Sequence, residues 1–194
     1  MTKDEKDLAE TTDDVVSSNS LFNKRRGLLT EFEAFTLEPS NTCGATSIPL
    51  TSTPTTIASL TDENELSIED DCDRVWLTCT VGWEAIANAP DGARQGNNVD
   101  VLFKIFRENR KHHRDLIFSC CQSANATEDN LQTTTFTHVD LPFAHKVHNP
   151  CEDDHCHKVP SVNYFVTAQL LNGGQANVIG PITCTGSQIA QNPR

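Results

Sequence analysis

The sequence predicts an all-β protein, an antiparallel jelly-roll sandwich that follows a disordered or extended N-terminal arm. Three observations support this prediction. Apolar and polar residues alternate over several short segments, turn-forming residues separate these segments, and no segment after residue 40 has the pattern of a long helix. About seven or eight short strands are typical of sandwich and jelly-roll folds. We assign residues 1–54 to the arm and residues 55–194 to the jelly-roll domain.

The clearest strand pattern runs from Arg74 to Trp83, where every second residue is apolar. A second pattern begins at Val162, and a third includes Val178, Ile182 and Cys184. The Asn172-Gly173-Gly174 segment between them predicts a β-hairpin, because Asn-Gly suits its tight turn. Less regular alternation predicts three further strands, at Val99–Arg107, Asp115–Cys121 and Thr133–Leu141.

The first third of the chain carries most of the negative charge. Residues 1–71 hold 15 acidic and 5 basic residues, a net charge of -10 out of -12 for the whole chain. The first twenty residues are too polar to bury much apolar surface, which predicts disorder. The segment from Leu21 to Leu37 is expected to form either a short amphipathic helix or an extended arm. The 37 % hydrophobic content of the chain agrees with an ordered part preceded by a polar segment.

Charge and hydropathy also exclude several classes of partner. Nucleic acids and anionic membranes require clustered Lys and Arg, so a net charge of -12 argues against both. No run of about 18 apolar residues is present, which excludes a transmembrane helix. The acidic N-terminus has no apolar core, so we expect no secretory signal peptide.

Eight cysteines suggest disulfide chemistry, although their connectivity cannot be read from the sequence. Cys79 and Cys184 lie on the apolar faces of their strands, which predicts either buried thiols or a bridge between strands. Cys120 and Cys121 are consecutive and should face opposite sides of a strand, so one could bond within the domain while the other reaches outward. Cys43 in the arm is either an exposed thiol or a link to another chain. The candidates for bonds between subunits are Cys43, Cys120 and Cys121, and those for bonds or core thiols within the domain are Cys72, Cys79, Cys151, Cys156 and Cys184.

A His/Cys-rich segment lies in a predicted loop at residues 142–160. One interpretation is a polar loop closed by a Cys151–Cys156 disulfide. The other is a zinc site, because imidazole and thiolate groups are preferred Zn²⁺ ligands. The candidate ligands for that site are His145, His148, Cys151, Cys156 and His157. Because their spacing matches no zinc-finger pattern, we expect no cofactor, and zinc at this loop is the alternative.

No enzyme class is indicated by the sequence. It contains no Gly-x-Ser-x-Gly, P-loop or dinucleotide-binding motif. A basic stretch from Arg107 to Arg114 falls between two predicted strands and is expected to be a solvated hairpin tip. The alternative for this stretch is a site that docks an acidic arm of a neighbouring chain.

Two strand segments carry a family resemblance. Val75-Trp76-Leu77-Thr78-Cys79-Thr80-Val81-Gly82-Trp83 and Val101-Leu102-Phe103-Lys104-Ile105-Phe106-Arg107 resemble paired strands of the exosporium protein C family of bacterial spore surfaces. The closing segment Asn177 to Gly186 is similar to the last strand of that family, and the segments Val139-Asp140 and Tyr164 to Thr167 fit its intermediate strands. The resemblance covers about residues 55 to 190. These are strand patterns and include no catalytic signature.

The resemblance implies a structural spore-surface protein, made in the mother-cell cytoplasm without a signal peptide. Such a protein would assemble with itself and with other spore-surface proteins into the exosporium layer or a spore appendage fibre. Disulfide links and exchange of an arm or strand would join its subunits. The alternatives are a non-covalent trimeric module of the tumour-necrosis-factor-like type and a metal-binding surface protein.

Overall fold

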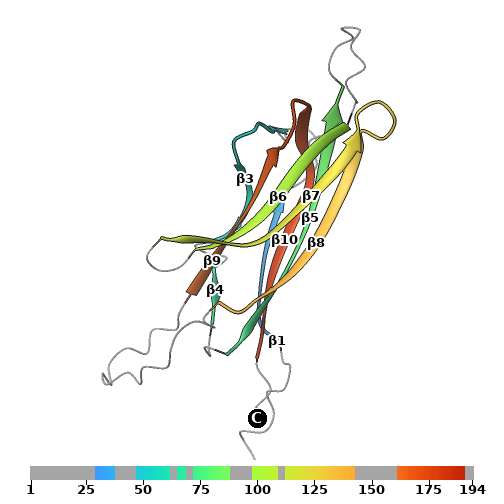
Figure 1. Ribbon diagram of the computed structural model, residues 1–194. Coiled ribbons are helices and arrows are strands. Elements are labelled where there is room, and N and C mark those ends of the chain that lie inside the picture. Colours follow the sequence, from blue (N-terminus) through green and yellow to red (C-terminus); the bar gives the residue numbers. More distant parts are fainter. Residues whose placement is uncertain are drawn as a thin grey trace, which may run out of the picture.

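The computed structural model describes residues 29–37, 47–61, 65–68, 72–87, 98–108, 112–142 and 161–190. Within these residues the secondary structure is entirely β, in two antiparallel sheets that face each other (Figure 1). No helix in the described part of the chain is long and apolar enough to cross a membrane.

The first sheet, sheet A, has the strand order β1-β10-β5-β8. Its strands are β1 (Leu29–Leu37), β10 (Gln175–Ile189), β5 (Arg74–Ile86) and β8 (Leu131–Asp140), and the short β2 (Ile48–Pro49) also pairs with β10. The second sheet, sheet B, has the order β3-β9-β6-β7. Its strands are β3 (Thr55–Leu60), β9 (Ser161–Leu170), β6 (Asn98–Glu108) and β7 (Arg114–Asn125), and β4 (Leu66–Ser67) also pairs with β9. Two facing antiparallel sheets with these strand orders form a jelly roll, which confirms the predicted fold class.

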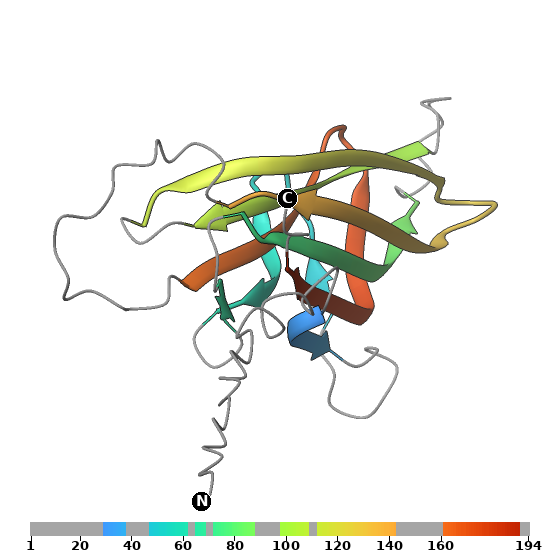
Figure 2. The same cartoon turned by 90° about the horizontal axis from the view of Figure 1, so that it is seen from below.

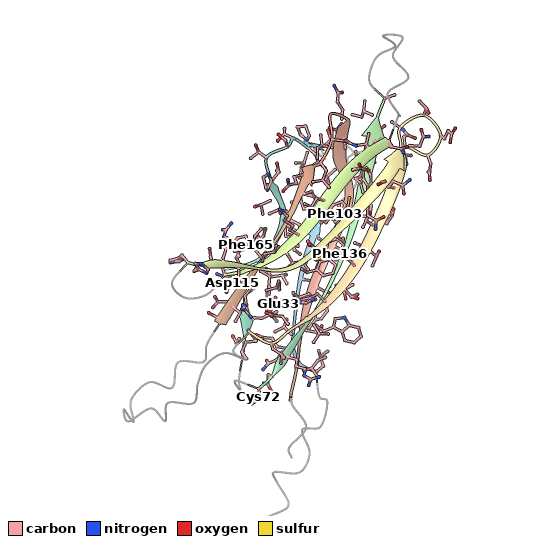
Figure 3. All side chains as sticks on the ribbon, viewed as in Figure 1. Glu33, Cys72, Phe103, Asp115, Phe136 and Phe165 are labelled. Carbon is pink, nitrogen blue, oxygen red and sulfur yellow. The ribbon has the colours of Figure 1, made fainter. Side chains whose placement is uncertain are left out.

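The core lies between the two sheets and consists of the alternate side chains that the sequence pattern identified. Trp83 of β5, Phe103 of β6 and Tyr164 of β9 are among its largest fully buried side chains. The Trp83 and Phe103 rings meet edge to face at 6.4 Å between their centroids. Trp83 Nε1 donates a hydrogen bond of 2.9 Å to Thr134 Oγ1, so the indole N–H is satisfied inside the core. Figure 3 shows Phe103 beside Phe136, whose ring lies 5.8 Å away.

The sandwich begins earlier in the chain than the sequence analysis expected. Residues 29–37 form the edge strand β1 and pair with β10 over nearly its whole length, as Figure 2 shows for the blue strand beside the dark red end of β10. The helical alternative for Leu21 to Leu37 is therefore wrong for residues 29–37. The sequence of this strand shows little alternation of apolar and polar residues. None of its side chains with a described position is fully buried, so both of its faces tolerate polar residues.

The predicted hairpin at Asn172-Gly173-Gly174 is wrong, although the turn itself is present. β9 pairs within sheet B and β10 within sheet A, so this turn crosses between the sheets. Asn172 stabilises the crossing, because its Nδ2 donates to Asp100 Oδ2 at 3.0 Å and its Oδ1 accepts from the Gly174 N–H at 3.2 Å. Turn chemistry is local and does not determine which strands pair beyond the turn.

Candidate functional site

The described residues contain no group of three or more His, Cys, Asp or Glu that could hold a metal ion. The predicted zinc ligands His145, His148, Cys151, Cys156 and His157 lie outside the described residues, as does Cys43. The metal-site prediction and the proposed arm cysteine therefore stay predictions. The surface and the remaining cysteines provide the candidate sites.

Cys79 and Cys184 are buried neighbours at the centre of the core. They lie directly opposite each other on β5 and β10, and both are unpaired thiols. A hydrogen bond with Cys184 and burial raise the pKa of the Cys79 thiol far above its usual range. The row of paired residues that contains Cys79 and Cys184 continues to Phe35 on β1 and to Phe136 on β8. Both side chains are buried, as predicted, and a protonated, enclosed thiol cannot serve as a surface nucleophile.

The consecutive cysteines of β7 face opposite sides, as predicted. Cys120 lies opposite Phe103 and is partly buried against the core, whereas Cys121 lies opposite Leu102 and is exposed. Partial desolvation, followed by the negative charge of Asp100, raises the pKa of the Cys121 thiol. Cys121 is therefore accessible to a second molecule, but it needs an oxidant or mild alkali to react quickly. Cys72 is also exposed and lies just before β5, outside the core.

β8 is an edge strand without the usual protection against pairing. In the described structure it pairs with β5 on one side only. Natural proteins block such edges with Lys, Pro or bulges, and β8 has none of these along its ten residues. The segment Leu131 to Thr137 carries no charge. The edge strand β7 of the other sheet, in contrast, has a bulge opposite Ile105 and Phe106, and charged residues at its start.

The open edge of β8 and the exposed Cys121 lie on the same side of the sandwich. β7 and β8 are the edge strands of the two sheets, and Phe118 of β7 stacks on Phe136 of β8 at 5.5 Å between ring centroids. Phe118 also packs against the His138 ring at 5.7 Å. These contacts fix the two edges relative to each other. We call the open edge of β8 together with Cys121 the assembly side.

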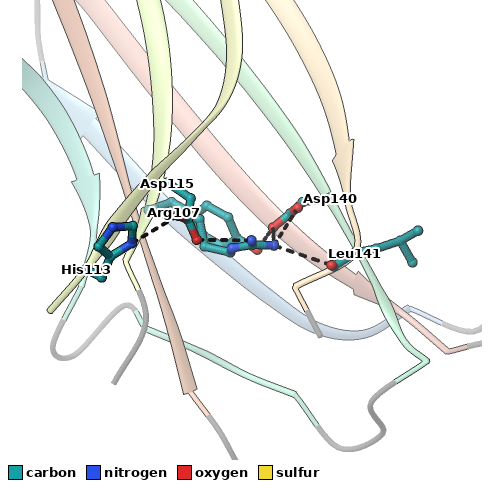
Figure 4. A network of polar contacts seen from close by, with 6 residues as sticks. Arg107, His113, Asp115, Asp140 and Leu141 are labelled. Atoms are coloured by element: carbon teal, nitrogen blue, oxygen red, sulfur yellow. Dashed lines mark hydrogen bonds and ion pairs between the residues drawn. The ribbon is translucent and has the colours of Figure 1, made fainter. Parts of the chain in front are cut away.

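A buried polar network fixes one end of the sandwich. Arg107 Nη1 donates to Asp140 Oδ1 at 3.1 Å and to Oδ2 at 3.3 Å, and Tyr164 Oη donates to Asp140 Oδ2 at 2.9 Å (Figure 4). The second guanidinium nitrogen lies 3.4 Å from Asp115 Oδ2. Burial, followed by the charge of Asp140, raises the pKa of Tyr164 well above its usual range. The network ties the end of β8 to the beginning of β9, which are the two strands that flank residues 143–160.

The basic stretch agrees only in part with the solvated tip that the sequence predicted, because the side chains of His112 and His113 are 88 % and 71 % exposed whereas that of Arg107 is not. Arg107 is mostly buried, with 16 % of its side chain exposed, because Asp140 lies beneath it. Arg114 Nε donates to Glu108 Oε1 at 3.0 Å, and its guanidinium stacks 3.7 Å above the Phe165 ring. The hydrogen bond from Arg114 lowers the pKa of Glu108. These two arginines are therefore engaged within the chain, which leaves Arg107 and Arg114 poorly suited to dock an acidic arm.

No protein-family model matches this chain, and no curated protein matches it. Among solved structures, the chain is similar to the Eiger TNF protein of S. frugiperda, with 13 % identity and a TM-score of 0.41 over 84 % of this chain and 96 % of that one. It is also similar to the CBM22-1 xylan-binding domain of Xyn10C from Paenibacillus barcinonensis, with 5 % identity and a TM-score of 0.39 over 87 % of this chain and 99 % of that one. At such identities the function of either protein does not transfer to this chain.

Sequence reasoning identified the cysteines of β5, β7 and β10 but missed two features. The open edge of β8 depends on strand order, which the alternating pattern does not contain. The partners of Arg107 also went unrecognised, because Asp140 and Tyr164 are distant in the sequence. The one available signal for Asp140 was a carboxylate at the end of a strand pattern, next to Leu141.

Proposed function

We propose that this chain is a structural protein of a bacterial spore surface, without enzymatic activity, that assembles through its assembly side. The observation that carries the proposal is the unprotected edge of β8, on the side of the sandwich where the neighbouring strand β7 carries the exposed thiol of Cys121. An unpaired edge offers backbone N–H and C=O groups to a strand from another molecule. A second copy supplies that strand, and a disulfide then makes the contact permanent.

The chemistry of the cysteines supports this order of events. Inside the cell thiols stay reduced, and the raised pKa of Cys121 further lowers its thiolate fraction near neutral pH. Edge pairing therefore forms first, and oxidation follows once the reducing cytoplasm is lost. Two Cys121 thiols then lose two electrons and two protons to molecular oxygen or a disulfide donor, and one S–S bond forms.

The spore-surface location rests on the resemblance of the strands around Trp76 and Phe103 to the exosporium protein C family. A protein placed there is released when the mother cell lyses, so it reaches an oxidising environment without secretion. The layer or fibre would contain this chain and other spore-surface proteins as partners. Disulfide-linked β-sheet contacts would resist the conditions that a dormant spore meets.

The first test is size analysis of the purified protein with and without reductant, compared with three single variants. Cys121→Ser should abolish the reductant-sensitive species, whereas Cys120→Ser should retain them because Cys120 is turned toward the core. Cys43→Ser reports whether the arm cysteine adds a link. A monomer, or a trimer that ignores reductant, would contradict covalent assembly, and the trimer would support the non-covalent module instead.

The second test addresses the edge directly. A synthetic peptide with the sequence of residues 131–140 should cap β8 and lower the mean particle mass, and a scrambled peptide of the same composition is its control. A peptide of residues 1–28 tests whether the arm is the donor strand. Assembly that proceeds unchanged with both peptides would overturn edge pairing.

A further inference from the structure

The outer face of sheet A carries an exposed apolar row that crosses all four long strands. Phe32 of β1 lies opposite Ser187 of β10, Ser187 opposite Trp76 of β5, and Trp76 opposite Val139 of β8. Residues opposite one another in a sheet share a face. Phe32, Trp76 and Val139 are 55 %, 50 % and 52 % exposed. Three large exposed apolar side chains in one row are typical of a surface that binds another molecule.

The two neighbouring rows are made almost entirely of threonine. Ala34, Thr185, Thr78 and Thr137 form the next row, and Thr36, Thr183, Thr80 and Thr135 form the one after it. None of these twelve positions carries a charge, in a chain whose net charge is -12. Along β5 the nearest charged residues on this face are Arg74 and Glu84, at opposite ends of the strand. We call these three rows the uncharged face.

We propose that the uncharged face binds the same face of a second copy of this chain. This inference rests on the proposed function and names a second contact within it. A hydroxyl group both donates and accepts hydrogen bonds, so a surface of threonines is complementary to itself. The Thr80 and Thr135 hydroxyls, 3.0 Å apart, already pair in this way within one sheet. Two acidic molecules also approach most easily through surfaces that carry no charge.

The size of the face indicates how this contact operates. Three strand spacings separate Phe32 from Val139, or about 14 Å, and Phe32 and Thr36 are about 13 Å apart along β1. The footprint is therefore a few hundred Å², below the roughly 800 Å² per partner of a standard stable interface. The contact is weak for an isolated pair and becomes effective when many copies are already linked.

A second contact is also what an extended assembly requires. Two β8 edges that pair about a two-fold axis form a closed dimer, and such a dimer does not grow further. The uncharged face lies on the outside of sheet A, at right angles to the pairing direction of the edge, so it remains available after edge pairing. Edge contacts and face contacts together allow a layer or fibre to grow.

The test replaces Trp76 with a charge of either sign. Trp76→Glu and Trp76→Lys should each raise the concentration at which large particles form by at least about tenfold, because both place a charge within the contact, in its apolar row. Leu171→Glu and Leu171→Lys are matched controls, since Leu171 is 51 % exposed and lies in the turn between β9 and β10. Light scattering measures particle mass, and non-reducing gels measure the disulfide-linked dimers, which should persist in both Trp76 variants.

The possible results separate the two proposals. Large particles at the wild-type concentration in both Trp76 variants would overturn the face contact and leave edge assembly intact. Loss of large particles in the Leu171 variants as well would also overturn it, because any surface charge would then have the same effect. A wild-type protein that never forms linked species would refute both the face contact and the proposed function. Phe32→Lys, on a different strand of the same row, repeats the test independently of Trp76.

Discussion

Replacement of Arg107 by methionine should destabilise the sandwich strongly, because it leaves a buried carboxylate without its cation. Only 7 % of the Asp140 side chain and 16 % of the Arg107 side chain are exposed. Methionine keeps much of the side-chain volume and removes the guanidinium contacts to Asp140, Asp115 and the Leu141 carbonyl. Asp140 then keeps the hydroxyl of Tyr164, 2.9 Å away.

The expected loss is about 3–5 kcal/mol in the free energy of unfolding, which is the usual effect of breaking one side of a buried ion pair. With a urea m-value of about 2–3 kcal/mol/M, this loss lowers the urea midpoint by about 1–2.5 M. Arg114→Met is the matched control, because the Arg114 side chain is 46 % exposed, so water can reach the site of its contact with Glu108. That change should cost about 1 kcal/mol or less, including the stacking on Phe165.

A double variant, Arg107→Met with Asp140→Asn, tests the reasoning itself. Asparagine still offers an acceptor to Tyr164 but carries no charge, so we expect the double variant to be more stable than Arg107→Met alone. Urea unfolding followed by tryptophan fluorescence measures all four proteins, since Trp83 lies in the core. A loss below about 1 kcal/mol in Arg107→Met, or a double variant no more stable than the single one, would refute the role of the buried charge.

Three further predictions concern the core and its thiols. The free energy of unfolding under reducing conditions should fall as pH rises above about 8.5. The hydrogen bond with Cys184 and burial raise the pKa of Cys79, and burial and the charge of Asp140 raise the pKa of Tyr164. The unfolded chain therefore releases these protons at a lower pH than the folded chain, which favours unfolding as pH rises. Cys79→Ala should flatten this dependence in urea unfolding measured between pH 7.5 and 10.5, and an unchanged slope would count against it. Cys121 should react with a maleimide mass tag in the native protein, while Cys79 and Cys184 react only after unfolding, and rapid labelling of either buried thiol would show that the core opens. Gly82→Ala should destabilise the protein more than Gly186→Ala. A Cβ at position 82 would clash with the backbone carbonyl of Gly180, whereas one at position 186 would meet the movable side-chain ends of Leu60 and Leu66. Equal losses of melting temperature in the two variants would contradict this prediction.

The sequence was sufficient to predict the strands that have one face in the core. β5 follows the alternation from Val75 to Trp83, and every one of those apolar positions is buried. β1 was ambiguous because an edge strand that covers little core needs no regular alternation, and Phe32 is exposed while Phe35 packs toward the core. Alternation of apolar and polar residues indicates which side chains face the core. It does not identify a strand that is held in the sheet mainly by backbone hydrogen bonds.

Properties that depend on contacts between distant residues were not predictable. Arg107 looked like part of a solvated basic stretch, and only the fold brings Asp140 beneath it. The turn at Asn172 looked like a hairpin, and only strand order shows that it joins two sheets. The candidate site follows the same rule. The sequence indicated that Cys120 and Cys121 face opposite sides, but it could not show that β7, the strand that carries them, neighbours the open edge of β8.

The edge strands β1, β7 and β8 differ in their protection against pairing with another strand. On β1 the acidic side chains Glu31 and Glu33 face inward, and Glu31 accepts a hydrogen bond of 2.6 Å from the Ser67 N–H of the opposite layer. Inward-facing charges and a bulge are devices that prevent edge pairing, and β1 and β7 carry them. β8 has no bulge, and its inward side carries a charge only at Asp140, its last residue. In the proposed assembly, pairing between copies is therefore expected at β8 rather than at β1 or β7, and oxidation of Cys121 on the neighbouring β7 would make it permanent.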